Sequence, residues 1–222
     1  MTKLFFNLFL VGFFVAGCTP NTAITYPVKI FDDNLNSAFS KLNESNSTKR
    51  TLLSIEKDEV TKKIETCTDL IRFIEQGFTI TEGVNNMQIA SEYQLCFQLS
   101  YLNNAVAAKK SYLPKPYINL IIEQLDLQTI SSSLKQKMDD KPQTIKVLSF
   151  LTPEKKNNSV IVDNSEWFFQ FNILAKGDFN NDGNEDLLVD FIDQAKKGNY
   201  FAHTTYILTK KMSDKYLSVV KL

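Results

Sequence analysis

Acidic and amide side chains recur at every second position of one short segment in the last quarter of the chain. Residues 177–190 read GDFNNDGNEDLLVD, which spaces Asp178, Asn180 and Asp182 evenly and places Gly183 and Asp186 after them. A hard divalent cation takes about six to eight oxygen ligands, and alternate acidic residues on a tightly turning segment can direct several carboxylates at one centre. The spacing therefore predicts a calcium site, and a bound cation should order the loop by relieving the repulsion between its carboxylates.

The elements on either side of this loop decide which kind of calcium loop it is. One predicted strand ends near Ala175 and another begins at Leu187, whereas an EF-hand needs helices on both sides and an acidic residue at its twelfth position. Counting from Asp178, the twelfth residue is Val189. The segment instead resembles the D-x-[DN]-x-D-G-x-x-D loop of FG-GAP and VCBS-type repeats. Those repeats usually occur in several copies and this chain carries one, so no β-propeller is implied. The resemblance implies a structural calcium ion with these ligands: Asp178, Asn180, Asp182, the backbone carbonyl of Asn184, and Asp186.

The same residues also allow a turn that needs no metal. The run Asn180-Asn181-Asp182-Gly183 can hold itself by side-chain to backbone hydrogen bonds, as Asn and Asp do in turns. If calcium binds, we expect a structural role, because the ligand set is complete without a substrate, and a dissociation constant of about 0.1–1 mM, by analogy with extracellular modules.

The first eighteen residues have the pattern of an export signal. Lys3 precedes an apolar run from Leu4 to Ala16 that ends in Val15-Ala16-Gly17-Cys18. A helix that spans a bilayer needs about 20 apolar residues, so the run is too short to be one. Its end resembles the lipobox of bacterial lipoproteins, and the resemblance implies removal of residues 1–17 and a diacylglyceryl thioether on Cys18, usually with a third acyl chain. The alternative is an ordinary cleaved signal with an incidental cysteine.

This signal also predicts a location. Two or more acyl chains anchor a protein stably, so the lipid on Cys18 would hold the chain to a membrane, with residues 18–26 as a lipidated tether. Thr19 rather than Asp follows Cys18, which by resemblance to the enterobacterial sorting rule favours the outer membrane, facing the periplasm. Losing Lys3 leaves 24 of the 25 basic residues against 25 acidic ones. The near-neutral mature chain gives no electrostatic reason to expect nucleic acid as a partner.

Two cysteines, Cys67 and Cys96, remain in the mature chain. An exported protein matures where thiols oxidise, so we predict that they form a disulfide between two helices that meet through a turn near residues 77–83. The alternative is a pair of buried free thiols that behave as small apolar side chains.

Apolar spacing predicts helices in the first half and strands in the second. Helical periodicity covers four segments, and the fourth is expected to break near Asp126: 31–42, 60–74, 95–106 and 120–134. After residue 141 the chain becomes β-prone, with short turns between strands: 144–151, 159–163, 167–175, 187–192, 200–209 and 215–222. The predicted class is therefore α+β, with a mainly helical region at 27–140 packed with an antiparallel meander at 141–222 that carries the Asp-rich loop 178–186.

Catalytic signatures are incomplete in this sequence. It has no G-x-S-x-G, no H-E-x-x-H and no glycine-rich phosphate loop. Ser54–Lys57 and Ser132–Lys135 match S-x-x-K, but the S-D-N and K-T-G elements that complete an acylase site are missing. His203 could act as a base, although a lone strand histidine is more often structural. Paired carboxylates acting on sugars leave no pattern in a sequence, and the single Trp167 offers little support for a sugar platform.

Two classes of function remain. The first is a non-catalytic, lipid-anchored envelope protein that binds a protein partner, for example as an inhibitor or immunity factor against an enzyme delivered into the periplasm. The second is a small periplasmic hydrolase in which calcium supports the fold. The missing nucleophile–base motif favours the first. A deep cleft gathering acidic residues or His203 would favour the second, and a broad exposed apolar or aromatic face would favour a protein partner.

Overall fold

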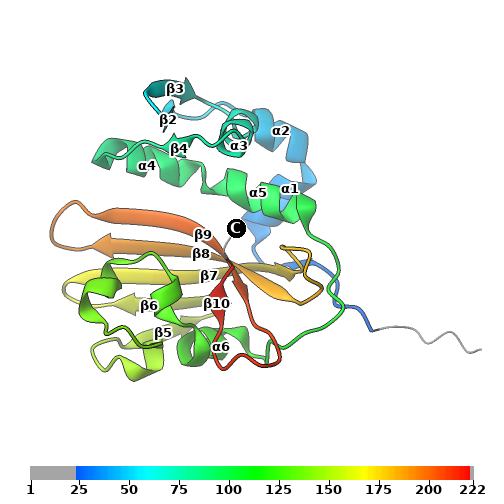
Figure 1. Cartoon of the computed structure of the whole chain (residues 1–222), viewed down its shortest axis with the longest axis vertical. Coiled ribbons are helices and arrows are strands. Elements are labelled where there is room, and N and C mark those ends of the chain that lie inside the picture. Colours follow the sequence, from blue (N-terminus) through cyan, green and yellow to red (C-terminus); the bar gives the residue numbers. More distant parts are fainter. Residues whose placement is uncertain (1–23, 221–222) are drawn as a thin grey trace, which may run out of the picture.

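The computed structural model describes residues 24–220, so the predicted lipobox and Cys18 lie outside the described residues. The predicted α+β class is confirmed: a helical layer formed early in the chain covers one face of an antiparallel sheet formed later (Figure 1). The helices are α1 Asp33–Ser40, α2 Leu42–Ser47, α3 Cys67–Glu75, α4 Val84–Glu92, α5 Gln94–Asn104 and α6 Tyr117–Gln124. Within the described range, no helix is both long and apolar enough to cross a bilayer.

The main sheet has seven strands within residues 24–220, and all its neighbours are antiparallel. The order is β10-β9-β8-β7-β6-β5, and β1 pairs with the end of β7. The predicted meander is therefore confirmed for consecutive strands. The bounds are β1 Lys29–Ile30, β5 Pro153–Lys156, β6 Ser159–Asp163, β7 Trp167–Gly177, β8 Asp186–Ala195, β9 Phe201–Thr209 and β10 Ser218–Val219.

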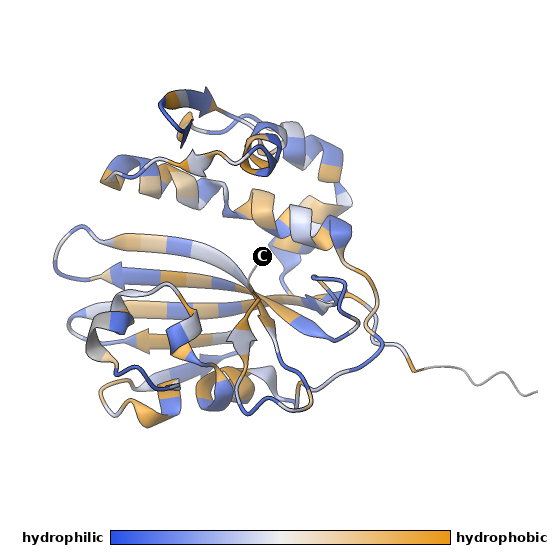
Figure 2. Ribbon diagram, viewed as in Figure 1, coloured by the Kyte–Doolittle hydropathy of each residue, from blue (hydrophilic) through white to orange (hydrophobic). Residues whose placement is uncertain are grey.

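Consecutive apolar residues run along the central strands (Figure 2). Because successive side chains point to opposite sides of a strand, the sheet has two apolar faces. On β8, Leu187, Val189 and Phe191 point to the core shared with α6 and three 3-10 turns. These turns are η1 Leu127–Thr129, η2 Ser133–Lys137 and η3 Ile145–Val147. Leu188 points the other way, to the core shared with α1 and α5. The sheet is thus the middle layer of three.

A second, three-stranded sheet lies above the helical layer and forms its outer side. Its order is β3-β2-β4, with bounds β2 Leu53–Lys57, β3 Val60–Ile64 and β4 Thr79–Ile80. Cys67 of α3 and Cys96 of α5 form a disulfide in the core of this unit, as predicted. The predicted connection through a single turn is wrong, because β4 and the unpredicted helix α4 lie between the two helices. The bond joins two helices that share one buried apolar cluster with β2, and Tyr93 is the largest side chain in that cluster.

Two predicted elements are wrong. Residues 60–64 were expected to begin a helix and instead form β3. The helix starts only at Cys67, after Thr66 caps it by accepting the Asp69 N–H at 3.1 Å through its hydroxyl. Residues 144–151 were expected to form a strand and instead contain η3 and a turn. Their buried side chains, Ile145, Leu148 and Leu151, recur every third residue, which is the period of a 3-10 turn.

Other boundaries differ less. The expected break near Asp126 is confirmed, because α6 ends at Gln124 and Asp126 caps the 3-10 turn that follows. The region 27–140 also contains the four short strands β1 to β4, which the predicted helical spacing did not include.

Candidate functional site

The predicted calcium loop joins β7 to β8, and the last paired residues before it are Gly177 and Asp186. Asp178 is buried at the base of the loop, and its carboxylate accepts backbone N–H bonds from Asp182 at 3.1 Å and Gly183 at 2.8 Å. The Asp182 carboxylate accepts the N–H of Asn184 at 2.9 Å. These contacts shape the loop as a self-bonded turn, the geometry that both the calcium loop and the metal-free alternative require.

Asp186 distinguishes this loop from an ordinary turn. Its side chain is fully buried, and its Oδ2 accepts the N–H of Phe179 at 3.2 Å. Its Oδ1 is buried and makes no hydrogen bond of normal geometry. The buried hydroxyl of Thr209, which also lacks a well-formed hydrogen bond, interacts with this carboxylate and favours its ionised form. Burial, together with the neighbouring Asp182 and Asp178 carboxylates, raises the pKa of Asp186 from 3.8 to about 7. A buried carboxylate oxygen without a well-formed hydrogen bond fits a cation, which would supply a compensating positive charge.

The five predicted ligand residues lie in one loop, but their side chains do not converge on a preformed cage. Asp178 and Asp186 are buried at its base, Asn180 is half-buried, and Asp182 is exposed. Among residues 24–220, no group of three or more His, Cys, Asp or Glu side chains is close enough to hold a metal ion. Asp182 and Asn180 would have to turn inward on binding, so the ligand set stays a prediction.

A segment that sequence reasoning missed clamps this loop. Residues 106–110 follow α5, and the N–H groups of Lys109 and Lys110 both donate to the Gly183 carbonyl, at 2.9 and 3.1 Å. The buried carboxylate of Glu185 accepts the Ser111 hydroxyl at 2.6 Å and pairs with the Lys176 ammonium. Residues 106–110 thus bond the loop to the segment that follows α5, so ordering of the loop is coupled to the helical layer.

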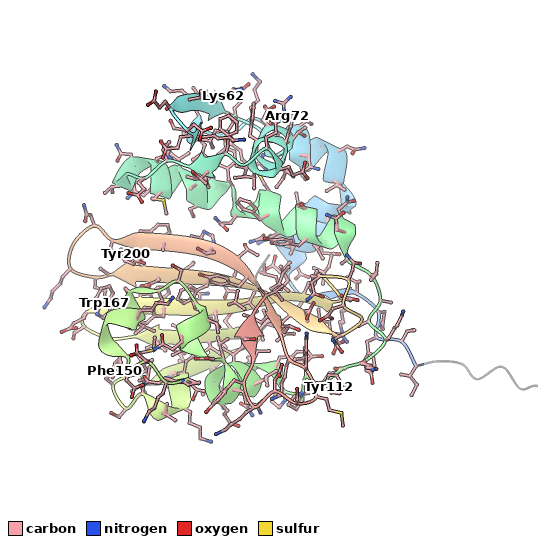
Figure 3. All side chains as sticks on the ribbon, in the orientation of Figure 1. Lys62, Arg72, Tyr112, Phe150, Trp167 and Tyr200 are labelled. Atoms are coloured by element: carbon pink, nitrogen blue, oxygen red, sulfur yellow. A yellow bond between two sulfur atoms is a disulfide. The ribbon has the colours of Figure 1, made fainter. Side chains whose placement is uncertain are left out.

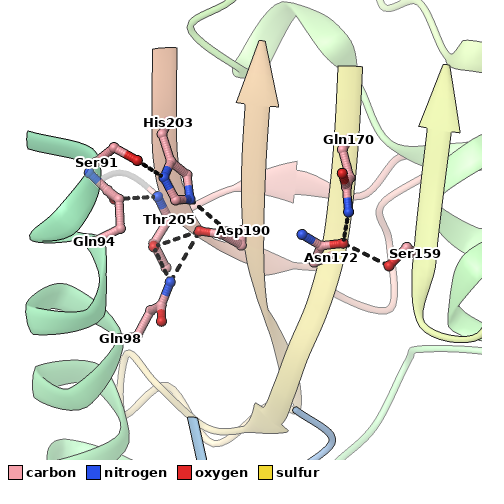
Figure 4. Close-up of polar contacts among 9 residues, drawn as sticks. All are labelled: Ser91, Gln94, Gln98, Ser159, Gln170, Asn172, Asp190, His203 and Thr205. Carbon is pink, nitrogen blue, oxygen red and sulfur yellow. Dashed lines mark hydrogen bonds and ion pairs between the residues drawn. The ribbon is translucent and has the colours of Figure 1, made fainter. Parts of the chain in front are cut away.

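A second polar group lies between the helical layer and the sheet (Figure 4). The Ser91 hydroxyl is 2.6 Å from Nδ1 of His203, and Nε2 of the same ring is 2.7 Å from Oδ2 of Asp190. The other Asp190 oxygen accepts from Gln98 Nε2 at 3.1 Å and Thr205 Oγ1 at 3.3 Å. His203 is thus not the isolated strand residue that the sequence suggested.

Four elements position these groups. Asp190 and Thr205 are directly paired across β8 and β9, and the two-residue period of β9 puts His203 on the same face. That face meets α4, which ends with Ser91 in its last turn, and α5, which supplies Gln98. Ser91 and His203 are 112 positions apart in the chain, so no local motif could reveal the pair.

Aromatic and apolar side chains gather at the end of the sheet where the β8–β9 turn lies. Trp167 and Tyr200 are in edge contact, with ring centroids 6.3 Å apart, and they join two open pockets. One pocket of about 340 Å³ is lined by Phe150 and Trp167, and the other, of about 460 Å³, by Met87 of α4 and Tyr200. Figure 3 shows the labelled Phe150, Trp167 and Tyr200 at this end. We call this surface the aromatic end and define it by Val84, Met87, Phe150, Trp167, Tyr200 and Phe201.

Neither S-x-x-K match has the geometry of an acylase site. Ser54 and Lys57 are three positions apart in β2, where successive side chains alternate, so they face opposite ways. Ser132 and Ser133 both donate through their hydroxyls to the buried carboxylate of Asp193, each at 2.9 Å, and so attach η2 to the sheet. These serines have a structural role.

Comparison of this chain with protein-family models, with curated proteins and with solved structures gives no match.

Proposed function

We propose that this protein is a lipid-anchored component of the cell envelope that binds a protein partner through its aromatic end. The observation that carries the proposal is the exposure of large apolar side chains there: Phe150 is 44% exposed, Tyr200 41% and Met87 37%. Aromatic residues and Met are enriched in the buried centres of protein interfaces, where a few of them carry most of the binding energy. A partner that presents apolar side chains to these two pockets fits this surface.

The position of the aromatic end agrees with an anchor at Cys18. The first described residues lie at the opposite end of the molecule from the β8–β9 turn (Figure 1). A lipid on Cys18 would then hold the molecule with its aromatic end directed away from the membrane. An inhibitor or immunity-type lipoprotein facing the periplasm would need this orientation to meet a partner in that compartment.

The calcium loop would have a structural role in this proposal. It lies at the opposite end of β8 from the β8–β9 turn, and ten residues of strand span about 33 Å. An ion in the loop therefore cannot touch a partner at the aromatic end. Calcium would act by fixing the β7–β8 connection, to which residues 106–110 are also bonded.

Replacing two side chains of the aromatic end by carboxylates tests the proposal. Residues 19–222 would be used as bait in envelope extract, and bound protein identified by mass spectrometry and then titrated as a pure pair. The variant Met87→Asp/Phe150→Asp is expected to weaken binding at least tenfold, because each charge would be buried against the partner.

Met212→Asp is the matched control. Met212 is 83% exposed and follows β9 at the far end of the sheet, so this variant should bind as the wild type does. Removal of calcium by a chelator, well below the melting temperature, should also leave the affinity unchanged. Equal loss of binding in both variants, or no stoichiometric partner at all, would contradict the proposal.

One specific observation favours the alternative, a small periplasmic hydrolase with calcium supporting the fold. It is the chain of hydrogen bonds from Ser91 through His203 to Asp190. A hydroxyl, an imidazole and a carboxylate in this order are the parts of a nucleophilic site.

A further inference from the structure

Ser91, His203 and Asp190 have distinct chemical roles because each occupies a different place in one chain of hydrogen bonds. When Nε2 of His203 carries the proton and donates it to Asp190, Nδ1 is the acceptor for the Ser91 hydroxyl. The serine then has a base within reach of its proton, and the imidazole has a carboxylate that fixes its tautomer. These are the roles of a Ser-His-Asp site, whatever the order of its residues in the chain. The two ring nitrogens are exchanged here, because in the serine-protease arrangement Nε2 faces the serine and Nδ1 faces the carboxylate.

The carboxylate is itself held in place. Oδ1 of Asp190 accepts from Gln98 and Thr205, which leaves Oδ2 for His203. The backbone N–H of Thr205 donates to Oε1 of Gln94 at 3.0 Å. Through Gln94 and Gln98, α5 therefore holds both Thr205 and Asp190 in place. The side chains of Asp190 and His203 are only 11% and 15% exposed, which limits competition from water for this hydrogen bond.

Ser91 is also reachable from solvent. It lines an open pocket of about 290 Å³ together with Gln88, Gln194, Asn199 and Tyr200, three of which carry side-chain amides. Amide N–H groups beside a nucleophile can donate to the oxyanion that forms during acyl transfer. Tyr200 also lines the neighbouring apolar pocket of the aromatic end, which could receive an acyl chain.

From this geometry we infer that Ser91 is the nucleophile of an acyl-transfer site that acts on esters with an apolar acyl group. The Ser91 oxygen attacks the carbonyl carbon, and its proton passes to Nδ1 of His203. The bond from carbon to the alcohol oxygen breaks, and the alcohol leaves with that proton. Water then attacks the acyl-serine while His203 takes its proton, which releases a carboxylic acid and restores Ser91. Asp190 acts as a positioning residue for His203.

An alkyl fluorophosphonate tests the inference, because it reacts with a serine oxygen only when that oxygen is activated. The mature lipidated protein in detergent would be incubated with the probe and weighed intact. We expect one adduct per chain, mapped to Ser91 by peptide sequencing. Ser91→Ala should abolish it, and His203→Gln should slow it at least tenfold. Ser100→Ala, on the neighbouring helix α5, should leave it unchanged.

An absent adduct in folded protein, or an adduct that persists in Ser91→Ala, would overturn the inference. Circular dichroism would establish that each variant is folded, so a missing adduct could not be attributed to unfolding. The inference does not depend on the proposed partner: Ser91→Ala should still bind it, whereas Met87→Asp/Phe150→Asp should not. Failure of one proposal is therefore distinguishable from failure of the other.

Discussion

Calcium at 5 mM is expected to raise the melting temperature of this protein by about 2–9 °C, given a dissociation constant of about 0.1–1 mM. An ion that binds only the folded state adds about 1–2 kcal/mol to the free energy of unfolding under these conditions. The expected site is the β7–β8 loop, where the buried Asp186 has an oxygen without a well-formed hydrogen bond. Differential scanning fluorimetry with and without calcium measures the shift.

A matched pair of variants assigns the shift to the loop. Asp182→Ala removes an exposed carboxylate that would turn toward the ion, so the melting temperature should no longer respond to calcium. Asp140→Ala removes an exposed carboxylate outside the loop and should respond as the wild type does. An unchanged calcium response in Asp182→Ala would remove the loop as the binding site.

The calcium effect should also depend on pH. Burial first, and the Asp182 and Asp178 carboxylates next, raise the pKa of Asp186 to about 7 in the folded protein without metal. In the unfolded chain this group titrates near 4, so its contribution to stability is complete below about pH 4 and is lost as pH rises to about 7. Calcium favours the ionised carboxylate, so the increase in melting temperature should be larger at pH 8 than at pH 5. Equal increases at both pH values would contradict the assignment.

Loss of the disulfide is the second large effect that we expect. Cys67 and Cys96 are separated by 29 positions, and closing a loop of this length restricts the unfolded chain by about 3–4 kcal/mol. The double variant Cys67→Ala/Cys96→Ala should therefore melt about 6–15 °C lower than the wild type. The double variant is needed because either single one leaves a free thiol in the core.

The position of the disulfide determines which part of the fold should loosen when it is reduced. It joins α3 to α5, and α5 also carries Leu99 against the sheet and Gln98 against Asp190. Hydrogen exchange in the reduced protein should therefore increase in α3 and α5 before it increases in β7 and β8. Uniform exchange, or a loss of stability below about 1 kcal/mol, would show that the helical unit does not need the bond.

Most of the later half of the fold could be predicted because its strands are rich in apolar and β-branched residues and are separated by clear turn residues. Phe169 and Phe171 of β7 point to the same face of the sheet. The loop between Gly177 and Asp186 is rich in Asn, Asp and Gly, which favour turns. Both apolar faces of β8 are visible in the residues from Leu187 to Phe191. The positions of β6 to β9 and of the acidic loop therefore followed from the sequence. β5 at Pro153–Lys156 was missed, and residues 144–151 were wrongly expected to form a strand.

The missed elements have spacings that fit more than one structure. Val60 and Ile64 are four positions apart, which places them on one face of a helix and also on one face of a strand. Ile145 and Leu148 are three apart, a separation that an apolar strand interpretation does not explain and a 3-10 turn does. By contrast, Leu53 and Ile55 are both buried in β2, and their two-residue alternation was a signal that could have been used.

The second polar site could be predicted only in part. Pairing of Asp190 with Thr205 follows once the register of β8 and β9 is known, and His203 then lies on the same face. Ser91 comes from α4, whose packing against β9 depends on the whole helical unit. Tertiary contacts of this kind bring together chemistry that no spacing in the chain encodes.

Site-specific photo-crosslinking in intact cells tests the central claim, partner binding at the aromatic end, most directly. A photoreactive amino acid would replace Met87 at this surface and, in a separate strain, Met212 at the far end of the sheet. The account predicts one crosslinked protein that forms from position 87 and not from position 212. No product at position 87, or the same products from both positions, would contradict it.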